Sequence, residues 1–503
     1  MEATFKQNFV WTTCLSAISF LTGFATLAII SYHFGTSAEL DAYWVAFTVV
    51  NVLAFPLTPL REALVPEFHA IRQKDKALAE RYFSGVMTLI LLVALTGVIS
   101  AYLLSEQLIA AAVSSNQPIT AILAGTHLYW LAPSLILMAL SETQSSILVA
   151  YNRVLEQTIF RMFGALTTLA LLFLLVDTLH DKVIASSLIA GQFATVASQY
   201  YALRRVGLQY KPSWPGNLGN RFFAVSGALM FTYAASQIYA VSEKNVLTTF
   251  NQGVISSFQY ATAITNVIIT IIGINLSNLL WPRFLAYASS GNRVQMLNEV
   301  TVVVRLIILV IGGLCTIIWL NASPLINILF VRGAFDVGSQ VLTTESLRIA
   351  VFAAIPISAG LVMGRALISI GEARSVMYTG FGMASAGCLT LFSGGWTGNS
   401  QLALSHWLVA NICGTLIQAI LLSKVCNGSN ELFIKSVWWI LRFATAMVAA
   451  ATASYFFLRT YFDGVGIVLI EIFLSTACFG VIYLPLIWIL GLMRGLPVII
   501  KLK

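Results

Sequence analysis

Fourteen long apolar stretches dominate this chain, and each has about the 20 residues that a helix needs to cross a bilayer. They cover 9–34, 41–65, 83–104, 122–150, 158–177, 183–203, 222–250, 254–281, 299–331, 345–370, 376–397, 401–423, 433–457 and 464–492. Hydrophobic residues make up 58% of the chain and charged residues only 10%, a balance that excludes an ordinary soluble domain. The sequence therefore predicts an all-α polytopic membrane protein with 14 transmembrane helices.

The positions of lysine and arginine predict the orientation. With the N-terminus inside, 18 of the 28 basic residues fall in cytoplasmic segments, and the opposite loops hold only Lys182, Arg332 and Arg459. Positive loops stay in the cytoplasm, so both termini are predicted to be cytoplasmic. This asymmetry, together with attraction to anionic lipid, accounts for the net charge of +8, and no nucleic-acid partner is expected.

A weak internal repeat predicts the domain organisation. Residues 34–68 align with 250–284 at an offset of 216 residues, and Val-Pro-Glu-Phe at 65–68 meets Trp-Pro-Arg-Phe at 281–284. Six spans lie between the two copies, so both copies share one orientation. We expect two parallel six-helix lobes and a terminal helix pair, and the predicted segments are 1–221, 222–423 and 424–503.

The first hairpin carries motifs that resemble a known transporter family. The segment "TGFATLAIISYHFGTSAELDAYWVAF" (22–47) and the later "VRGAFD" (331–336) are similar to the MurJ/MviN proteins of the multidrug, oligosaccharidyl-lipid and polysaccharide exporter superfamily. The resemblance implies a flippase that works by alternating access around a central cavity. It also implies an undecaprenyl-diphosphate-linked saccharide as substrate, contact with membrane lipid, and a place in the bacterial inner membrane. We expect a monomer, with a polysaccharide polymerase or glycosyltransferases as further partners.

The sequence departs from this family at the cavity arginines of its lipid II flippases. The corresponding positions hold Phe20, Thr26, Ala54, Phe55 and Ala263. An anionic diphosphate in a low-dielectric cavity needs cationic partners. We therefore interpret the chain as a flippase for a surface-polysaccharide repeat unit. A lipid II flippase for peptidoglycan synthesis is one alternative, favoured by the motifs. A cation-coupled drug antiporter of the same superfamily is the other, although such antiporters normally have twelve spans.

Charged residues inside the apolar stretches are the candidate substrate site, because each charge at a bilayer centre costs about 2.5 to 3.5 kcal/mol. We expect Lys244 to meet the diphosphate or an acidic sugar, and Glu243 to tune it; a purely structural ion pair is the alternative. The other candidates are Asn245, Arg61, Glu62, Glu142 and Arg365. Arginines near a predicted cytoplasmic boundary, Arg61, Arg161, Arg305 and Arg365, have a second interpretation, in which they reach out to the lipid headgroups.

Small residues and prolines are the candidate gate. Pro56 and Pro59 leave carbonyl groups unpaired and are predicted to bend the second span. Since the lipid tail is too long to be enclosed, a lateral opening is expected where the first and eighth spans meet, at Gly23, Ala261 and Ala263. Asp41, at the start of its span, is expected to cap its own helix.

The sequence contains no nucleotide-binding loop, catalytic nucleophile motif or metal-ligand spacing. We therefore expect no enzymatic activity and no cofactor or metal. Transport would then draw on the membrane potential or an ion gradient, and H+ or Na+ is a possible coupling ion. A coupled cation needs a carboxylate, and Glu142 and Glu243 are the deep acids available.

Overall fold

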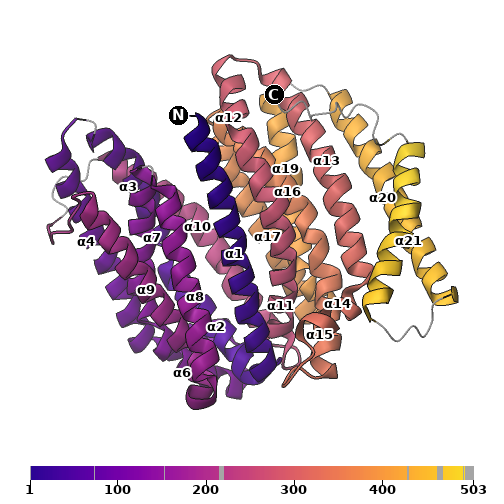
Figure 1. The fold of residues 1–503 in the computed structure, drawn as a ribbon, viewed down its shortest axis with the longest axis horizontal. Coiled ribbons are helices and arrows are strands. Elements are labelled where there is room, and N and C mark those ends of the chain that lie inside the picture. Colours follow the sequence, from indigo (N-terminus) through magenta and orange to yellow (C-terminus); the bar gives the residue numbers. More distant parts are fainter. Residues whose placement is uncertain are drawn as a thin grey trace. The chain divides into compact units, whose positions relative to one another are not determined.

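The computed structural model describes residues 2–72, 74–151, 153–214, 220–426, 430–461, 468–490 and 492, and all regular structure in these ranges is helical (Figure 1). The chain separates into two compact units. The first comprises Met1–Ser256 with Arg332–Phe335, and the second comprises Ser257–Val331 with Asp336–Lys503. The predicted segments, with boundaries at 221 and 423, follow an internal repeat in the sequence, whereas the two units are defined by packing. The three segments therefore remain a prediction.

The first unit contains ten α-helices, coloured from indigo to magenta in Figure 1. They are α1 (Glu2–Phe34), α2 (Ala38–Ala54), α3 (Leu57–Arg72), α4 (Lys76–Leu103), α5 (Ser105–Ala112), α6 (Pro118–Leu131), α7 (Ser134–Ala150), α8 (Val154–Leu179), α9 (Val183–Arg205) and α10 (Asn220–Leu247), with a 3-10 turn η1 (His180–Lys182). Helix α8 packs against α9 and α1, α2 packs against α6, and α3 packs against α4, α7 and α10.

The second unit contains the remaining helices. They are α11 (Val254–Ile268), whose first residues belong to the first unit, the π-helical η2 (Ile269–Ile274), α12 (Asn275–Ser289), α13 (Arg293–Leu320), α14 (Ala322–Phe330), α15 (Val337–Ala350), the 3-10 turn η3 (Val351–Ala353), α16 (Ala354–Ser369), α17 (Ala373–Thr397), α18 (Ser400–Leu404), α19 (His406–Val425), α20 (Asn430–Tyr461) and α21 (Val468–Ile489). Helix α20 packs against α21 and α13, and the Tyr483 hydroxyl donates to the Leu309 carbonyl at 2.8 Å.

The structure confirms a polytopic all-helical membrane protein. Among the described residues, nine helical segments are long and apolar enough to cross a membrane, or up to eleven when each of two bent pairs is one span. One of the nine, Leu155–Arg205, runs for 51 residues and holds both α8 and α9. Every predicted stretch contains helix, but length and hydropathy alone do not establish all 14 as crossings.

Prolines bend two of the predicted spans. Helices α2 and α3 meet at 44° at the Phe55–Pro56 step, as the sequence predicts, and α6 and α7 meet at 50° beside Pro133. Proline has no N–H to continue the helical ladder, and its ring clashes with the carbonyl four residues earlier. The second half of each span therefore takes its own direction.

Helices α8 and α9 approach unusually closely because glycines face each other. A Cβ atom added at Gly164 would lie 1.9 Å from Thr195 Oγ1 and 2.6 Å from the Gly191 carbonyl oxygen. The relation is reciprocal, since a Cβ at Gly191 would lie 1.9 Å from Thr168 Oγ1. Small residues four positions apart on each helix thus allow the two backbones to touch, which is the usual way in which membrane helices associate.

Candidate functional site: a charged cavity in the first unit

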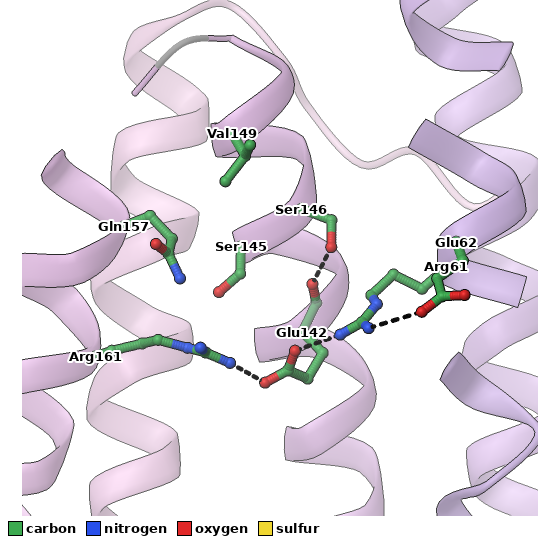
Figure 2. A pocket seen from close by; sticks show the side chains of 8 residues that line it. All are labelled: Arg61, Glu62, Glu142, Ser145, Ser146, Val149, Gln157 and Arg161. Carbon is green, nitrogen blue, oxygen red and sulfur yellow. Dashed lines mark hydrogen bonds and ion pairs between the residues drawn. The ribbon is translucent and has the colours of Figure 1, made fainter. Parts of the chain in front are cut away.

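The first unit contains an open polar cavity of about 440 Å3 (Figure 2). Its lining consists of Arg61, Glu62, Glu142, Ser145, Ser146, Val149, Gln157 and Arg161. These side chains come from α3, α7 and α8. Four of the eight are charged, although all three helices lie in predicted membrane spans, where charge is costly and usually functional.

Glu142 lies at the centre of the charged group. Figure 2 shows the guanidinium groups of Arg61 and Arg161 reaching its carboxylate from opposite sides, one bonding Oε2 and the other Oε1. The side chains of Arg61, Glu142 and Arg161 are 22%, 40% and 49% exposed, so the group is open to the cavity rather than sealed within the protein. A site of this kind can exchange its internal ion pairs for a bound ion.

Glu62 extends the charged group toward α10. Its Oε1 lies 3.9 Å from a guanidinium nitrogen of Arg61 and accepts a hydrogen bond of 2.9 Å from the Tyr233 hydroxyl. The cavity therefore holds two positive and two negative side chains. These four charges sum to zero. A charged ligand must therefore compete with the existing ion pairs for the same side chains.

The structure brings together three of the predicted site residues, Arg61, Glu62 and Glu142, and adds Arg161 and Tyr233. For Arg161 the sequence suggests a headgroup contact, whereas in the structure its side chain lines the cavity. The sequence held a signal for it. Glu142 lies nine residues before Tyr151 and Arg161 eight residues after Arg153, so in an antiparallel hairpin both side chains reach the same depth.

Lys244 and Glu243 lie elsewhere in the first unit, near the end of α10, and do not line the cavity. Lys244 is only 3% exposed, and its Nζ bonds Glu243 Oε1 at 2.6 Å. The next residue, Asn245, donates to the Ala111 carbonyl of α5 at 3.2 Å. This end of α10 is therefore tied into the protein, and a substrate-binding role for the three residues remains a prediction.

Asp41 does not cap its own helix, so that prediction is wrong. The Ser37 hydroxyl caps α2 by accepting from the Leu40 N–H. The Asp41 carboxylate instead accepts the backbone N–H groups of Gly253 at 2.6 Å and Ser256 at 2.8 Å, and the Ser256 hydroxyl at 2.5 Å. It thereby satisfies unpaired N–H groups at the positive end of α11. The sequence could not show this contact, because it spans more than 200 residues.

The remaining candidates are spread over both units. Arg365 belongs to the second unit, where its guanidinium lies 4.0 Å from the centre of the Trp281 ring and donates to Asn278 at 3.2 Å. Gly23, on α1, has open space around the position of a Cβ atom. Ala261, on α11, is fully buried, and Ala263 on the same helix is partly buried. The gating roles of these small residues remain predictions.

Within the described part of the chain, no group of three or more histidine, cysteine or acidic side chains could hold a metal ion.

Comparisons with known proteins agree on one family. The sequence model described as "Lipid II flippase MurJ" matches residues 30–474. A "Probable lipid II flippase MurJ" from Buchnera aphidicola subsp. Schizaphis graminum is 24% identical over 344 residues, 67% of each chain. Another of the same name, from Buchnera aphidicola subsp. Baizongia pistaciae, is 22% identical over 455 residues, covering 88% of this chain and 87% of the relative.

Two solved structures share the fold. The first, described as "Lipid II flippase MurJ, inward closed conformation", has a TM-score of 0.76 and 19% identity, and the match covers 96% of this chain and 99% of that one. The second is an inward-facing multidrug transporter of the MATE family, within the same superfamily of exporters. Its TM-score is 0.66 at 16% identity, and the match covers 82% of this chain and 96% of that one.

Proposed function

Because the chain belongs to the MurJ family of lipid II flippases, we propose that it carries lipid II, the lipid-linked precursor of peptidoglycan, across the bacterial inner membrane. It is a transporter of the superfamily that also contains the MATE proteins, and not an enzyme. The observation that carries the proposal beyond family membership is the charged cavity of α3, α7 and α8, which can receive a charged head group inside a membrane protein.

Our interpretation of the chain as a surface-polysaccharide flippase is wrong. The family model that covers residues 30–474 is that of lipid II flippases, and the curated relatives carry the same name. The argument against lipid II rested on five positions that lack arginine. Arg61, already a candidate of the substrate site, and Arg161 lie on other helices and supply cations to the cavity.

The proposal includes 14 spans with both termini in the cytoplasm, which the distribution of Lys and Arg supports. A cysteine at Gly338 is then expected to react with an impermeant maleimide added to intact cells, and a cysteine at Ala77 only after the membrane is opened. Both changes are made in a background without the six native cysteines. Labelling in the opposite pattern would contradict the orientation.

We further propose that transport is driven by the membrane potential or by coupled H+ or Na+, since moving one charge through 100 mV is worth about 2.3 kcal/mol. In the cavity, Glu142 and Glu62 are the carboxylates available to a coupled cation. A lipid-linked saccharide whose tail stays in the bilayer is the substrate that this arrangement supports.

Complementation tests the proposed function. Expression of this chain in a bacterium depleted of its own lipid II flippase is expected to restore growth and the appearance of lipid II on the outer leaflet, measured by its accessibility to an added lipid II-degrading enzyme. The depleted strain without this chain is the negative control. Membrane insertion of the chain without any outward lipid II would refute the proposal.

A further inference from the structure

The cavity has one unusual feature, a single carboxylate shared by two guanidinium groups. Arg61 bonds one oxygen of Glu142 and Arg161 bonds the other, and the two arginines come from α3 and α8 on either side of α7 (Figure 2). Among the described residues, Glu142 is the only ion-pair partner of Arg161, while Arg61 has Glu62 as a second partner at 3.9 Å. The two cations are thus spaced around one small anion.

We propose that Arg61 and Arg161 form a binding site for the diphosphate group of the lipid-linked substrate, and that Glu142 occupies this site as an internal counter-ion which the diphosphate displaces. The inference rests on the proposed function and adds a place and a mode of binding to it. Neither arginine occupies one of the five positions compared above.

The chemistry of the two anions favours exchange. A carboxylate has one negative charge and two oxygens, so each guanidinium bonds a single oxygen of Glu142. A diphosphate diester has two negative charges and four non-bridging oxygens, and each phosphate can meet one planar guanidinium with two parallel hydrogen bonds. Arg61 and Arg161 could then each bind one phosphate. Exposure of 22% and 49% leaves both groups accessible to such a ligand.

The rest of the lining suits the parts of the substrate next to the diphosphate. Gln157 lies one helical turn before Arg161 and faces the cavity, where its amide can bond a sugar hydroxyl. The Ser145 hydroxyl accepts a hydrogen bond from Gln199 at 2.8 Å and is held in place by it. With about 440 Å3, the cavity has the size of a small-molecule site and can take a diphosphate and an adjoining sugar.

Displacement gives Glu142 a second task, which is release. When the substrate leaves, the free carboxylate can return to the two guanidinium groups and take back the bonds that held the diphosphate. A site with Arg61 and Arg161 but no internal anion would hold the diphosphate more tightly and let it go more slowly. Removing the Glu142 charge should therefore strengthen binding while it slows transport.

The test measures binding to the purified full-length chain in detergent by isothermal titration calorimetry, with geranylgeranyl diphosphate as the probe. Arg61→Gln and Arg161→Gln are each expected to weaken binding by tenfold or more, and Glu142→Gln to tighten it by fivefold or more. Arg153→Gln is the matched control: Arg153, the N-cap residue of α8, pairs with Glu156 in the first turn of that helix, is not part of the cavity lining, and should leave binding unchanged.

Two further probes separate the sources of phosphate. Inorganic pyrophosphate should compete with the prenyl diphosphate, because the site recognises the head group. Phosphatidylglycerol, a lipid with a single phosphate charge, should not compete at equal concentration. Equal competition by phosphatidylglycerol would assign the arginines to the bulk lipid surface and overturn the proposal.

A structural role for Glu142 gives a different result. If the carboxylate only holds α3, α7 and α8 together, Glu142→Gln lowers the melting temperature and weakens or does not change binding, and the proposal fails. Since Arg161 is half exposed, the Arg161→Gln variant should still fold. Its loss of binding therefore tests the site independently of Glu142. If the chain fails to complement but its binding of the probe depends on the arginines, the proposed function alone is refuted. If the chain complements but all variants bind the probe equally, this site alone is refuted.

Discussion

Replacing Gly164 with alanine is expected to destabilise the first unit severely, although the change adds one methyl group. The new Cβ atom would lie 1.9 Å from Thr195 Oγ1 and 2.6 Å from the Gly191 carbonyl oxygen, and atoms cannot approach so closely. The Thr195 hydroxyl can rotate away from its 3.0 Å hydrogen bond to Gly191, but the Gly191 carbonyl is part of the backbone, so the two helices must move apart. We expect a loss at or above the upper end of the roughly 1 to 3 kcal/mol typical of overpacking.

The melting temperature of the detergent-purified protein, followed by fluorescence-detected size exclusion, measures this effect. Gly125→Ala is the matched control, because that glycine is also helical but has no atom within 4 Å of the added methyl group. It should be neutral or slightly stabilising, since alanine favours helix more than glycine does. Adding Thr195→Ala to Gly164→Ala should rescue only part of the loss, because the Gly191 carbonyl remains in the way. Equal stability of Gly164→Ala and the control would show that α8 and α9 are not in close contact.

Replacing Asp41 with alanine is the second change with a large expected effect. Asp41 is 5% exposed and accepts three hydrogen bonds, two from backbone N–H groups at the start of α11. Without the carboxylate those donors stay buried and unsatisfied, at about 1 to 3 kcal/mol each. The positive charge of the buried Lys244, which acts on this carboxylate, also loses part of its compensation. We expect a loss of roughly 3 to 5 kcal/mol in all, because three buried donors lose their acceptor together.

Two other variants locate the cause of this loss. Asp41→Asn keeps one acceptor oxygen and should melt between the wild type and Asp41→Ala. Ser37→Ala removes the cap of α2 itself and should cost only about 1 kcal/mol. The same thermal assay applies to all three. If Asp41→Ala melts no lower than Ser37→Ala, the carboxylate does not hold the end of α11.

The sequence predicts the helices of this protein well because one physical requirement acts on every residue of a span. A backbone in hydrocarbon must satisfy its own hydrogen bonds, so a stretch such as 83–104 has to be helical, and all of it but the last residue lies within α4. The bend at Pro56 is equally local, since a missing N–H has the same effect in any helix. The sequence does not predict the π-helical turn Ile269–Ile274, because a single glycine such as Gly273 is also tolerated within an ordinary α-helix.

Contacts between distant residues are the part that sequence reasoning could not supply. Asp41 and Ser256 are joined by the tertiary fold, and no pattern in either segment refers to the other. Glu142 and Arg161 are close enough in sequence for a hairpin argument, yet the proximity of Arg161 to a predicted boundary suggested a headgroup contact instead.

The incorrect substrate assignment has the same origin. Phe20, Thr26 and the other compared positions show only that arginine is missing from particular places on particular helices. A cavity is formed by several helices, and a cation from α3 or α8 can reach it as well as one from α1. The charge of a cavity depends on which side chains the packed helices bring together. A comparison of sequence positions does not give that information.

Arg61 and Glu142 both lie on helices that follow a proline bend. Pro56 and Pro133 lie before the helices that carry Arg61 and Glu142, while the preceding halves, α2 and α6, pack on each other. Arg61 is five residues beyond its joint and Glu142 nine beyond its own, about 8 Å and 14 Å along the helix axes at 1.5 Å per residue. A turn of roughly 10° at Pro133 would therefore swing Glu142 through about 2 Å, further than a hydrogen bond tolerates. Glu142 lies farther from its bend than Arg61 does from its own, so the same change of angle would move the carboxylate more than the guanidinium. Such a change would separate the ion pair while α2 and α6 keep their places.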